Sequence, residues 1–143
     1  MGRRAACRQT AVMQVTAEAH PMDVFLVEDS APVVQRLEEM LCAIDGVRTV
    51  GSAARADDAI RSVLALRPDA VLCDVGLAQG TGFDVLRALR EQAPGVEVYM
   101  LSNFATEPYR RLAARLGARD FFDKSSEFER MRDAVAARAA SPH

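Results

Sequence analysis

The sequence predicts an α/β fold in which helices cover both faces of a parallel sheet. After Met22, short apolar runs alternate five times with amphipathic segments of helical period. Apolar runs without polar alternation are typical of strands buried on both faces. Strands that alternate with helical patterns indicate βαβ crossovers. A chain of 143 residues is long enough for one domain with a sizeable core.

Five strands are predicted from the apolar runs. Each run is short and bounded by turn signals, which is typical of a buried strand. The fifth run is the shortest, with two phenylalanines. In chain order, the predicted strands are 23–27, 49–53, 70–74, 97–102 and 121–122.

Five helices are predicted between and after these strands. The first has Pro32 in its first turn and Gly46 at its end. The second stops before Pro68, because proline disfavours helical geometry in the residue before it. Pro94 ends the third, and Gly117 closes the fourth. The apolar residues at helical spacing are Val34, Leu37, Leu41 and Ile44; Ile60, Val63 and Leu64; Phe83, Leu86 and Leu89 within 83–92; Tyr109, Leu112, Ala113 and Leu116; and Phe128, Met131 and Val135 within 126–139.

This pattern places one domain in residues 22–140. Residues 1–21 have no sustained period and are expected to form a mobile N-terminal extension, with an interaction arm as the alternative. Met13 and Met22 are alternative starts of the chain. Residues 141–143 are expected to form a short tail.

Composition narrows the class of partners and the compartment. The net charge of −2 supplies no basic field of the kind that nucleic acid binding requires. No apolar stretch approaches the roughly 20 residues of a membrane helix. The three cysteines, Cys7, Cys42 and Cys73, are odd in number and lack CxxC spacing, so free thiols are expected. We therefore expect a cytoplasmic protein with no nucleic acid or membrane partner.

Polar side chains follow four of the five predicted strands. Glu28 and Asp29 come directly after the first, Asp74 ends the third, Ser102 ends the fourth, and Lys124 follows the fifth within two residues. The carboxyl ends of parallel strands meet at one edge of the sheet, where functional crevices lie. Three acids, a hydroxyl and an amine are therefore expected to share one site.

Lys124 is the only lysine among 18 cationic side chains, the others being arginines. A lone lysine suggests a position that needs a compact ammonium rather than a planar guanidinium. The alternative is a solvated lysine that follows a strand by chance.

The three acids favour a divalent cation. Close carboxylates repel one another unless a proton or a cation is shared among them. Mg²⁺ suits oxygen ligands, and the backbone carbonyl of Gly76 is a further candidate donor. Zinc is disfavoured, because neither histidine falls inside the folded pattern. The alternative is helix capping by Asp29 or Ser30, which explains one acid but not both.

Together these residues resemble the receiver domain of response regulators in bacterial two-component signalling. The similarity runs from about residue 23 to about residue 139. It includes Val-Glu-Asp-Ser at 27–30, Asp-Val-Gly-Leu-Ala-Gln-Gly-Thr-Gly at 74–82, Met-Leu-Ser-Asn at 100–103 and Gly-Ala-Arg-Asp-Phe-Phe-Asp-Lys at 117–124. The resemblance implies a flavodoxin-like, doubly wound sheet of five strands in the order 2-1-3-4-5.

The resemblance also implies roles for the residues at the sheet edge. Asp74 would accept a phosphoryl group from a sensor histidine kinase or a histidine phosphotransfer protein. Glu28 and Asp29, with Asp74 and the carbonyl of Gly76, would hold Mg²⁺. Lys124 would offset charge on the transferred oxygens.

Two residues are implied in switching. Ser102 would hydrogen-bond the phosphoryl oxygen, and Phe121 occupies the aromatic switch position. The fourth helix, fifth strand and last helix would then present a rearranged surface to a protein target that sequence does not identify. A homodimer is left open, as is the choice between a stand-alone receiver similar to chemotaxis regulators and a piece of a longer regulator.

Four positions depart from the family pattern. Ala78 and Ser125 stand where proline is usual, and the bond before the second of these prolines is commonly cis. Because a cis bond before serine costs about 3 kcal/mol, we expect it to be absent or strained here. Asn103 stands where alanine or glycine is usual, and Phe104 follows it, which leaves the lifetime of a phosphoryl group open.

Three alternatives have different sequence requirements. A haloacid-dehalogenase-like phosphohydrolase needs an acid two residues after its nucleophile, where this chain has Gly76. A flavin carrier would need a phosphate-cradling loop after the first strand, where Glu28 and Asp29 repel phosphate. A phosphate-independent, receiver-like interaction module would not need the intact set of polar residues.

Overall fold

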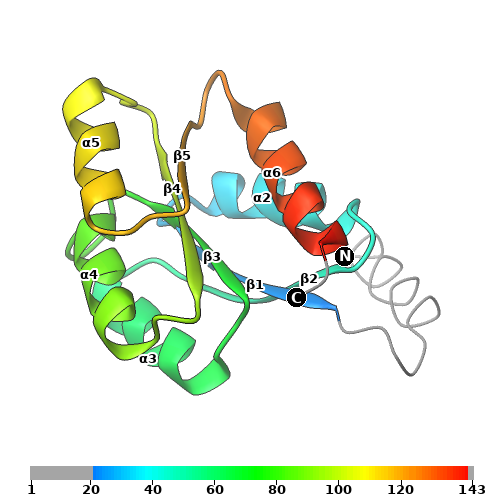
Figure 1. Ribbon diagram of the computed structural model, residues 1–143, viewed down its shortest axis with the longest axis horizontal. Coiled ribbons are helices and arrows are strands. Elements are labelled where there is room, and N and C mark those ends of the chain that lie inside the picture. Colours follow the sequence, from blue (N-terminus) through cyan, green and yellow to red (C-terminus); the bar gives the residue numbers. More distant parts are fainter. Residues whose placement is uncertain (1–20, 142–143) are drawn as a thin grey trace.

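The computed structural model describes residues 21–141 and contains one sheet of five parallel strands. The strand order β2-β1-β3-β4-β5 confirms the predicted flavodoxin-like fold (Figure 1). The elements are β1 (Met22–Val27), α2 (Ala31–Cys42), β2 (Val47–Ala53), α3 (Ala56–Leu66), β3 (Ala70–Asp74), α4 (Gly82–Gln92), β4 (Glu97–Ser102), α5 (Glu107–Arg115), β5 (Asp120–Asp123) and α6 (Phe128–Ala140).

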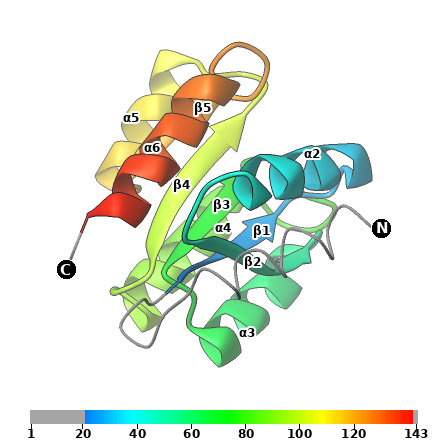
Figure 2. The same cartoon turned by 90° about the vertical axis from the view of Figure 1, so that its right-hand side faces the viewer.

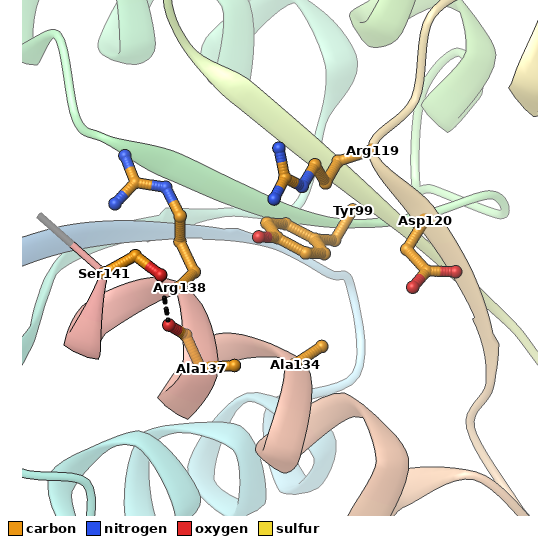
Figure 3. Close-up of a pocket in the computed structure, with 7 residues that line it drawn as sticks. All are labelled: Tyr99, Arg119, Asp120, Ala134, Ala137, Arg138 and Ser141. Carbon is orange, nitrogen blue, oxygen red and sulfur yellow. Dashed lines mark hydrogen bonds between the residues drawn. The ribbon is translucent and has the colours of Figure 1, made fainter. Parts of the chain in front are cut away.

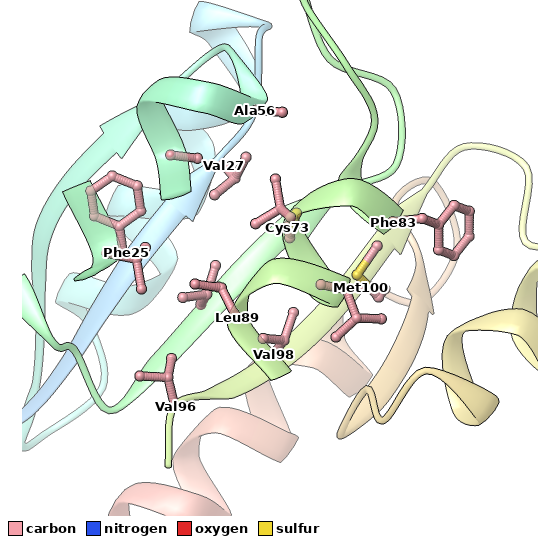
Figure 4. Close-up of a cluster of buried hydrophobic side chains, with 14 of the residues drawn as sticks. Phe25, Val27, Ala56, Cys73, Phe83, Leu89, Val96, Val98 and Met100 are labelled. Carbon is pink, nitrogen blue, oxygen red and sulfur yellow. The ribbon is translucent and has the colours of Figure 1, made fainter. Parts of the chain in front are cut away.

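The sheet separates two apolar clusters. Side chains alternate between sheet faces along each strand, so Phe25 and Val27 join one cluster while Val24 and Leu26 join the other. Helices α3, α4 and α5 cover the first face and α2 and α6 cover the second, as the two views show (Figures 1 and 2). Figure 4 shows the first cluster, in which Cys73 of the central strand is fully buried.

Several predicted boundaries shift by a few residues. Strand β2 begins at Val47 rather than residue 49, because Val47 pairs with Met22 at the start of β1. Helix α2 ends at Cys42, and Gly46 lies beyond it with a φ of 80°. Helix α6 begins at Phe128 rather than residue 126, since Ser125 and Ser126 belong to a turn after β5.

Two aromatic residues, Phe128 and Tyr109, are less buried than their helical spacing suggests. Phe128 is only partly buried, and the Arg36 guanidinium lies 4.0 Å from the centre of its ring. Tyr109 is exposed and meets Phe83 edge-on, with ring centres 5.6 Å apart.

Two predicted segments lie largely outside the described residues. The predicted extension, residues 1–21, lies outside the described residues apart from Pro21, and so do the last two residues of the predicted tail, 142–143.

Cys73 is a free thiol as predicted, but Cys42 is disulfide-bonded, so the prediction of a free thiol is wrong for that residue. Cys7 lies outside the described residues. Within residues 21–141, no helix has the length and apolar character to cross a membrane.

The order in which strands are added to the sheet reverses at β1, and this reversal point marks the edge where a site is expected. The chain passes from β1 to its neighbour β2 and then returns to β3 on the other side. In open α/β sheets, ligands bind outside the carboxyl ends of the strands at such a reversal point. Here those ends are Glu28 and Asp29 after β1 and Asp74 in β3.

Gly82 allows the backbone to pack closely behind Asp74. A Cβ atom on Gly82 would lie 2.1 Å from the carbonyl oxygen of Asp74, while the Gly82 amide donates a hydrogen bond of 2.8 Å to the carbonyl of Val75. Since both partners are backbone, neither can move away by a change of rotamer. The first residue of α4 must therefore be glycine for Asp74 to keep this position.

We predict that Gly82→Ala lowers the free energy of unfolding by about 2 kcal/mol through overpacking, despite the better helix propensity of alanine. Urea unfolding measures this change. Gly95→Ala is the matched control, because a Cβ there meets nothing within 4 Å. Equal midpoints for the two variants would contradict the prediction.

Candidate functional site

The structure brings the three predicted acids together. One carboxylate oxygen from each of Glu28, Asp29 and Asp74 lies within 4.8 Å of the others. Glu28 and Asp74 are buried, at 3% and 7% exposure, whereas Asp29 is exposed. Of the three carboxylates, that of Asp29 is therefore the one most accessible from solvent.

Neither Glu28 nor Asp29 is used to cap the helix that follows β1. Ser30 is the N-cap of α2 and accepts a hydrogen bond from the Val33 amide at 3.5 Å. The Ser30 amide in turn donates to Glu28 Oε2 at 3.1 Å, which holds the Glu28 side chain toward the sheet edge. Capping is therefore performed by Ser30, and the capping alternative does not account for Glu28 or Asp29.

Lys124 joins the acids from the other side of the sheet edge. Its Nζ donates to Glu28 Oε1 at 2.8 Å and lies 3.2 Å from Asp74 Oδ2. The Lys124 side chain is 9% exposed, so it is not the solvated lysine of the alternative interpretation. Its backbone amide donates to the carbonyl of Ser102 at 2.9 Å, which ties the end of β5 to the end of β4.

Burial and the neighbouring charges shift the ionisation of the site. Burial, with the charge of Glu28, raises the pKa of Asp74 to about 6, although Lys124 acts in the opposite direction. Burial works against the charge on Lys124, but its hydrogen bond to Glu28 and the charge of Asp74 outweigh this effect and raise the pKa of Lys124. The site therefore stabilises the charged form of Lys124 and destabilises the charged form of Asp74.

The remaining predicted site residues lie at the same edge in different settings. Ser102 is buried at the end of β4, and its Oγ accepts a hydrogen bond of 2.9 Å from the Phe104 amide. Phe121 is 5% exposed and pairs with Met100 across the β4 and β5 strands. Gly76 is exposed in the loop after β3, where it bridges to Thr81.

The loop that carries Lys124 is held by a residue that the sequence reasoning missed. Oδ1 of Asp123 accepts hydrogen bonds from the Ser125 amide at 2.8 Å, the Ser125 hydroxyl at 2.6 Å and the Ser126 amide at 3.2 Å. Among the described residues there is no cis peptide bond, which agrees with the expectation for Ser125. An Asp followed two residues later by Ser is a known turn signal and could have indicated this arrangement.

The donor set fits a hard divalent cation. The three residues all offer carboxylate oxygens, which are the ligand type that Mg²⁺ prefers. Zinc sites usually include histidine or cysteine, and this group contains neither. The unfavourable charge on Asp74 is relieved by any cation that the group shares. Glu28, Asp29 and Asp74 are therefore the residues that could hold a metal ion.

A second hollow lies away from this edge. A cavity of about 250 Å³ lies between the amino-terminal parts of β4 and β5 and the end of α6 (Figure 3). Its lining includes Tyr99, Arg119 and Arg138, and the two arginines already pair with Glu97. None of the predicted site residues lines this cavity.

The strand order defines a flavodoxin-like α/β protein. The groups available for chemistry at the reversal point of the sheet are three carboxylates and a buried lysine. The family model of the response regulator receiver domain matches residues 24–136. The chain belongs to this family.

Curated relatives agree with this assignment. The chain is 35% identical over 111 residues to the regulatory protein LuxO of Vibrio cholerae, covering 77% of this chain and 24% of LuxO. It is 28% identical over 112 residues to the response regulator GacA of Pseudomonas aeruginosa, covering 78% of this chain and 52% of GacA. The chain thus spans about a quarter to a half of the length of these two relatives.

Solved structures share the fold at lower sequence identity. A chain from the CheX-CheY-BeF3-Mg complex of Borrelia burgdorferi has a TM-score of 0.78 at 21% identity, covering 85% of this chain and 92% of that chain. The response regulator domain of Thermotoga maritima CheB has a TM-score of 0.73 at 23% identity, covering 84% and 94%. These likenesses establish the architecture.

The raised pKa of Asp74 predicts a pH-dependent stability in metal-free buffer. A carboxyl whose pKa is higher in the folded state loses stabilisation as pH rises from its ordinary value of 3.8 through about 6. Asp74→Asn should therefore increase the free energy of unfolding at neutral pH by on the order of 2 kcal/mol, and the gain should shrink toward pH 3.8.

Chemical unfolding with a chelator present, repeated across this pH range, measures the difference. Asp133→Asn is the control, because Asp133 is exposed and its ion pair is with Arg132 rather than with a residue of the site. A gain for Asp74→Asn that is independent of pH would contradict the charge explanation.

Proposed function

We propose that this chain is a phosphorylation-activated receiver in which Asp74 accepts a phosphoryl group. The single observation that carries the proposal is the placement of Lys124, whose ammonium contacts both Glu28 and Asp74 beside a three-carboxylate group. Receiver family membership supports the same chemistry. The donor would be a sensor histidine kinase or a histidine phosphotransfer protein, and the compartment the cytoplasm.

The transfer step follows from the residues at the sheet edge. A carboxylate oxygen of Asp74 forms a bond to phosphorus, and the phosphorus–nitrogen bond of the donor phosphohistidine breaks, with its electron pair remaining on the imidazole. Phosphoryl transfer depends mainly on positioning and charge stabilisation. Lys124 would place its ammonium next to the transferred oxygens, and Glu28 would hold Lys124 there.

Mg²⁺ is the proposed cofactor. Glu28, Asp29 and Asp74 would hold it, and the carbonyl of Gly76 is the proposed further ligand. When bound, the ion would neutralise the carboxylates and the transferred oxygens, as metal ions do in phosphoryl transfer. Asp29 gives the site its exposed entrance.

Switching would begin at Ser102. Its hydroxyl, which accepts a hydrogen bond from the Phe104 amide, would donate its own hydrogen to the phosphoryl group and draw the loop after β4 inward. Phe121 is the proposed aromatic switch, and the surface of α5, β5 and α6 is the proposed output for a protein target. The chain itself is proposed to be a phosphoacceptor rather than an enzyme with an external substrate.

We predict that Mg²⁺ and a small acyl phosphate add one phosphoryl mass to the native chain. Intact mass spectrometry measures the labelling, which should be absent in Asp74→Asn and should need more Mg²⁺ in Asp29→Asn, because one charged ligand is lost. Labelling of Asp74→Asn at the native rate would overturn the assignment. Equal Mg²⁺ dependence of the native and Asp29→Asn chains would overturn the metal site.

We also predict that Lys124→Arg folds and binds Mg²⁺ but switches poorly. A longer, planar guanidinium keeps the charge but cannot occupy the same buried space between Glu28 and Asp74. Phosphoryl incorporation and phosphorylation-dependent amide shifts, measured in parallel, report the two properties. Native behaviour in both would show that charge alone is sufficient at this position.

A further inference from the structure

We propose that Arg110 is a positioning residue that couples the Asp74 site to helix α5. This inference rests on the proposed phosphorylation of Asp74 and adds to it a residue outside the acidic group. Arg110 lies on α5, beside β5, and its side chain is 33% exposed. Its guanidinium connects three segments, each of which also carries one of the residues proposed to respond to phosphate.

Three hydrogen bonds make this connection. Nε of Arg110 donates to the carbonyl of Ala105 at 3.3 Å, Nη1 donates to the carbonyl of Phe121 at 3.1 Å, and Nη2 donates to Glu127 Oε1 at 3.1 Å. The guanidinium carbon also lies 5.4 Å from the centre of the Phe121 ring. A planar group with five fixed donors can satisfy three acceptors at once, which an ammonium on a flexible stem cannot do in this geometry.

The first acceptor belongs to the segment that follows Ser102. Ala105 lies three residues after Ser102, and the hydrogen bond from the Phe104 amide to Ser102 Oγ fixes the intervening backbone. A movement of Ser102 toward a phosphoryl group would therefore carry this segment with it. Arg110 then loses its bond to Ala105 or follows it.

The other two acceptors belong to the strand and loop around Lys124. Phe121 precedes Lys124 by three residues, and Glu127 follows it by three. Oε1 of Glu127 also accepts the Asp123 amide at 2.9 Å, and the Glu127 amide donates to the Asp123 carbonyl at 2.9 Å, so the loop from 123 to 127 is closed on itself. A displacement of Lys124 is therefore transmitted to Glu127 and to Arg110.

This arrangement gives α5 a direct response to the site. Because Arg110 is on α5, a change in the relative position of its three acceptors must either break bonds or move the helix. Arg111, the next residue, forms a long ion pair of 3.6 Å with Glu107 on the same helix, and within residues 21–141 it forms no hydrogen bond to any of the three segments. It therefore provides a matched control with the same charge and the same helix.

The test uses beryllium fluoride with Mg²⁺ as the phosphoryl mimic and records backbone amide shifts of the full chain. In Arg110→Met, shifts around residues 74–76 should persist, while those within α5 should be largely lost, because the connection between α5 and the two neighbouring segments is removed. Arg110→Lys should show the same loss despite its retained charge, and Arg111→Met should respond like the native chain.

The outcomes separate this inference from the proposed function. No shift anywhere in the native chain would overturn the proposed function and with it this inference. A native response that persists in α5 of Arg110→Met would overturn the role of Arg110 alone. If Arg110→Met does not fold, Arg110→Lys serves as the test: a reduced α5 response with unchanged shifts around 74–76 supports the inference, and an unchanged α5 response overturns it.

Discussion

The site depends on one buried cation placed between two buried carboxylates. Burying Glu28 and Asp74 side by side would be costly without a positive charge, since both lose water and repel each other. The Lys124 ammonium offsets this cost through contacts of 2.8 Å and 3.2 Å. It does so incompletely, because the pKa of Asp74 remains raised. The remaining negative charge is the physical reason that the edge suits a further cation.

Backbone contacts also support this arrangement. The Lys124 amide donates to the Ser102 carbonyl, the Val75 amide donates to the Leu101 carbonyl, and Gly82 permits the close approach of α4 to Asp74. These contacts join β3, β4 and β5 at their carboxyl ends. The charged groups are thus fixed by short backbone bonds, while the exposed Asp29 and the loop after β4 remain accessible to ligands.

This chain also holds its lysine loop in a way that differs from the usual family pattern. Proline at position 125 would remove the amide that Ser125 donates to Asp123. Here the Asp123 carboxylate gathers three donors, and hydrogen bonds from Ser125 lower the pKa of Asp123. The turn is thus held by hydrogen bonds to the Asp123 carboxylate rather than by a proline ring. Glu127 and Arg110 extend this hydrogen-bond network to α5.

The sequence by itself determined the alternation of strands and helices and the polar residues at strand ends, because apolar periodicity and turn residues are local properties. The lone Lys124 was also recognisable from composition. The strand order came only from family resemblance, and the Arg110 network came only from the tertiary structure. Arg110 resembles the other surface arginines until folding places two carbonyls and a carboxylate around it, since long-range partners leave no periodic signal in the chain.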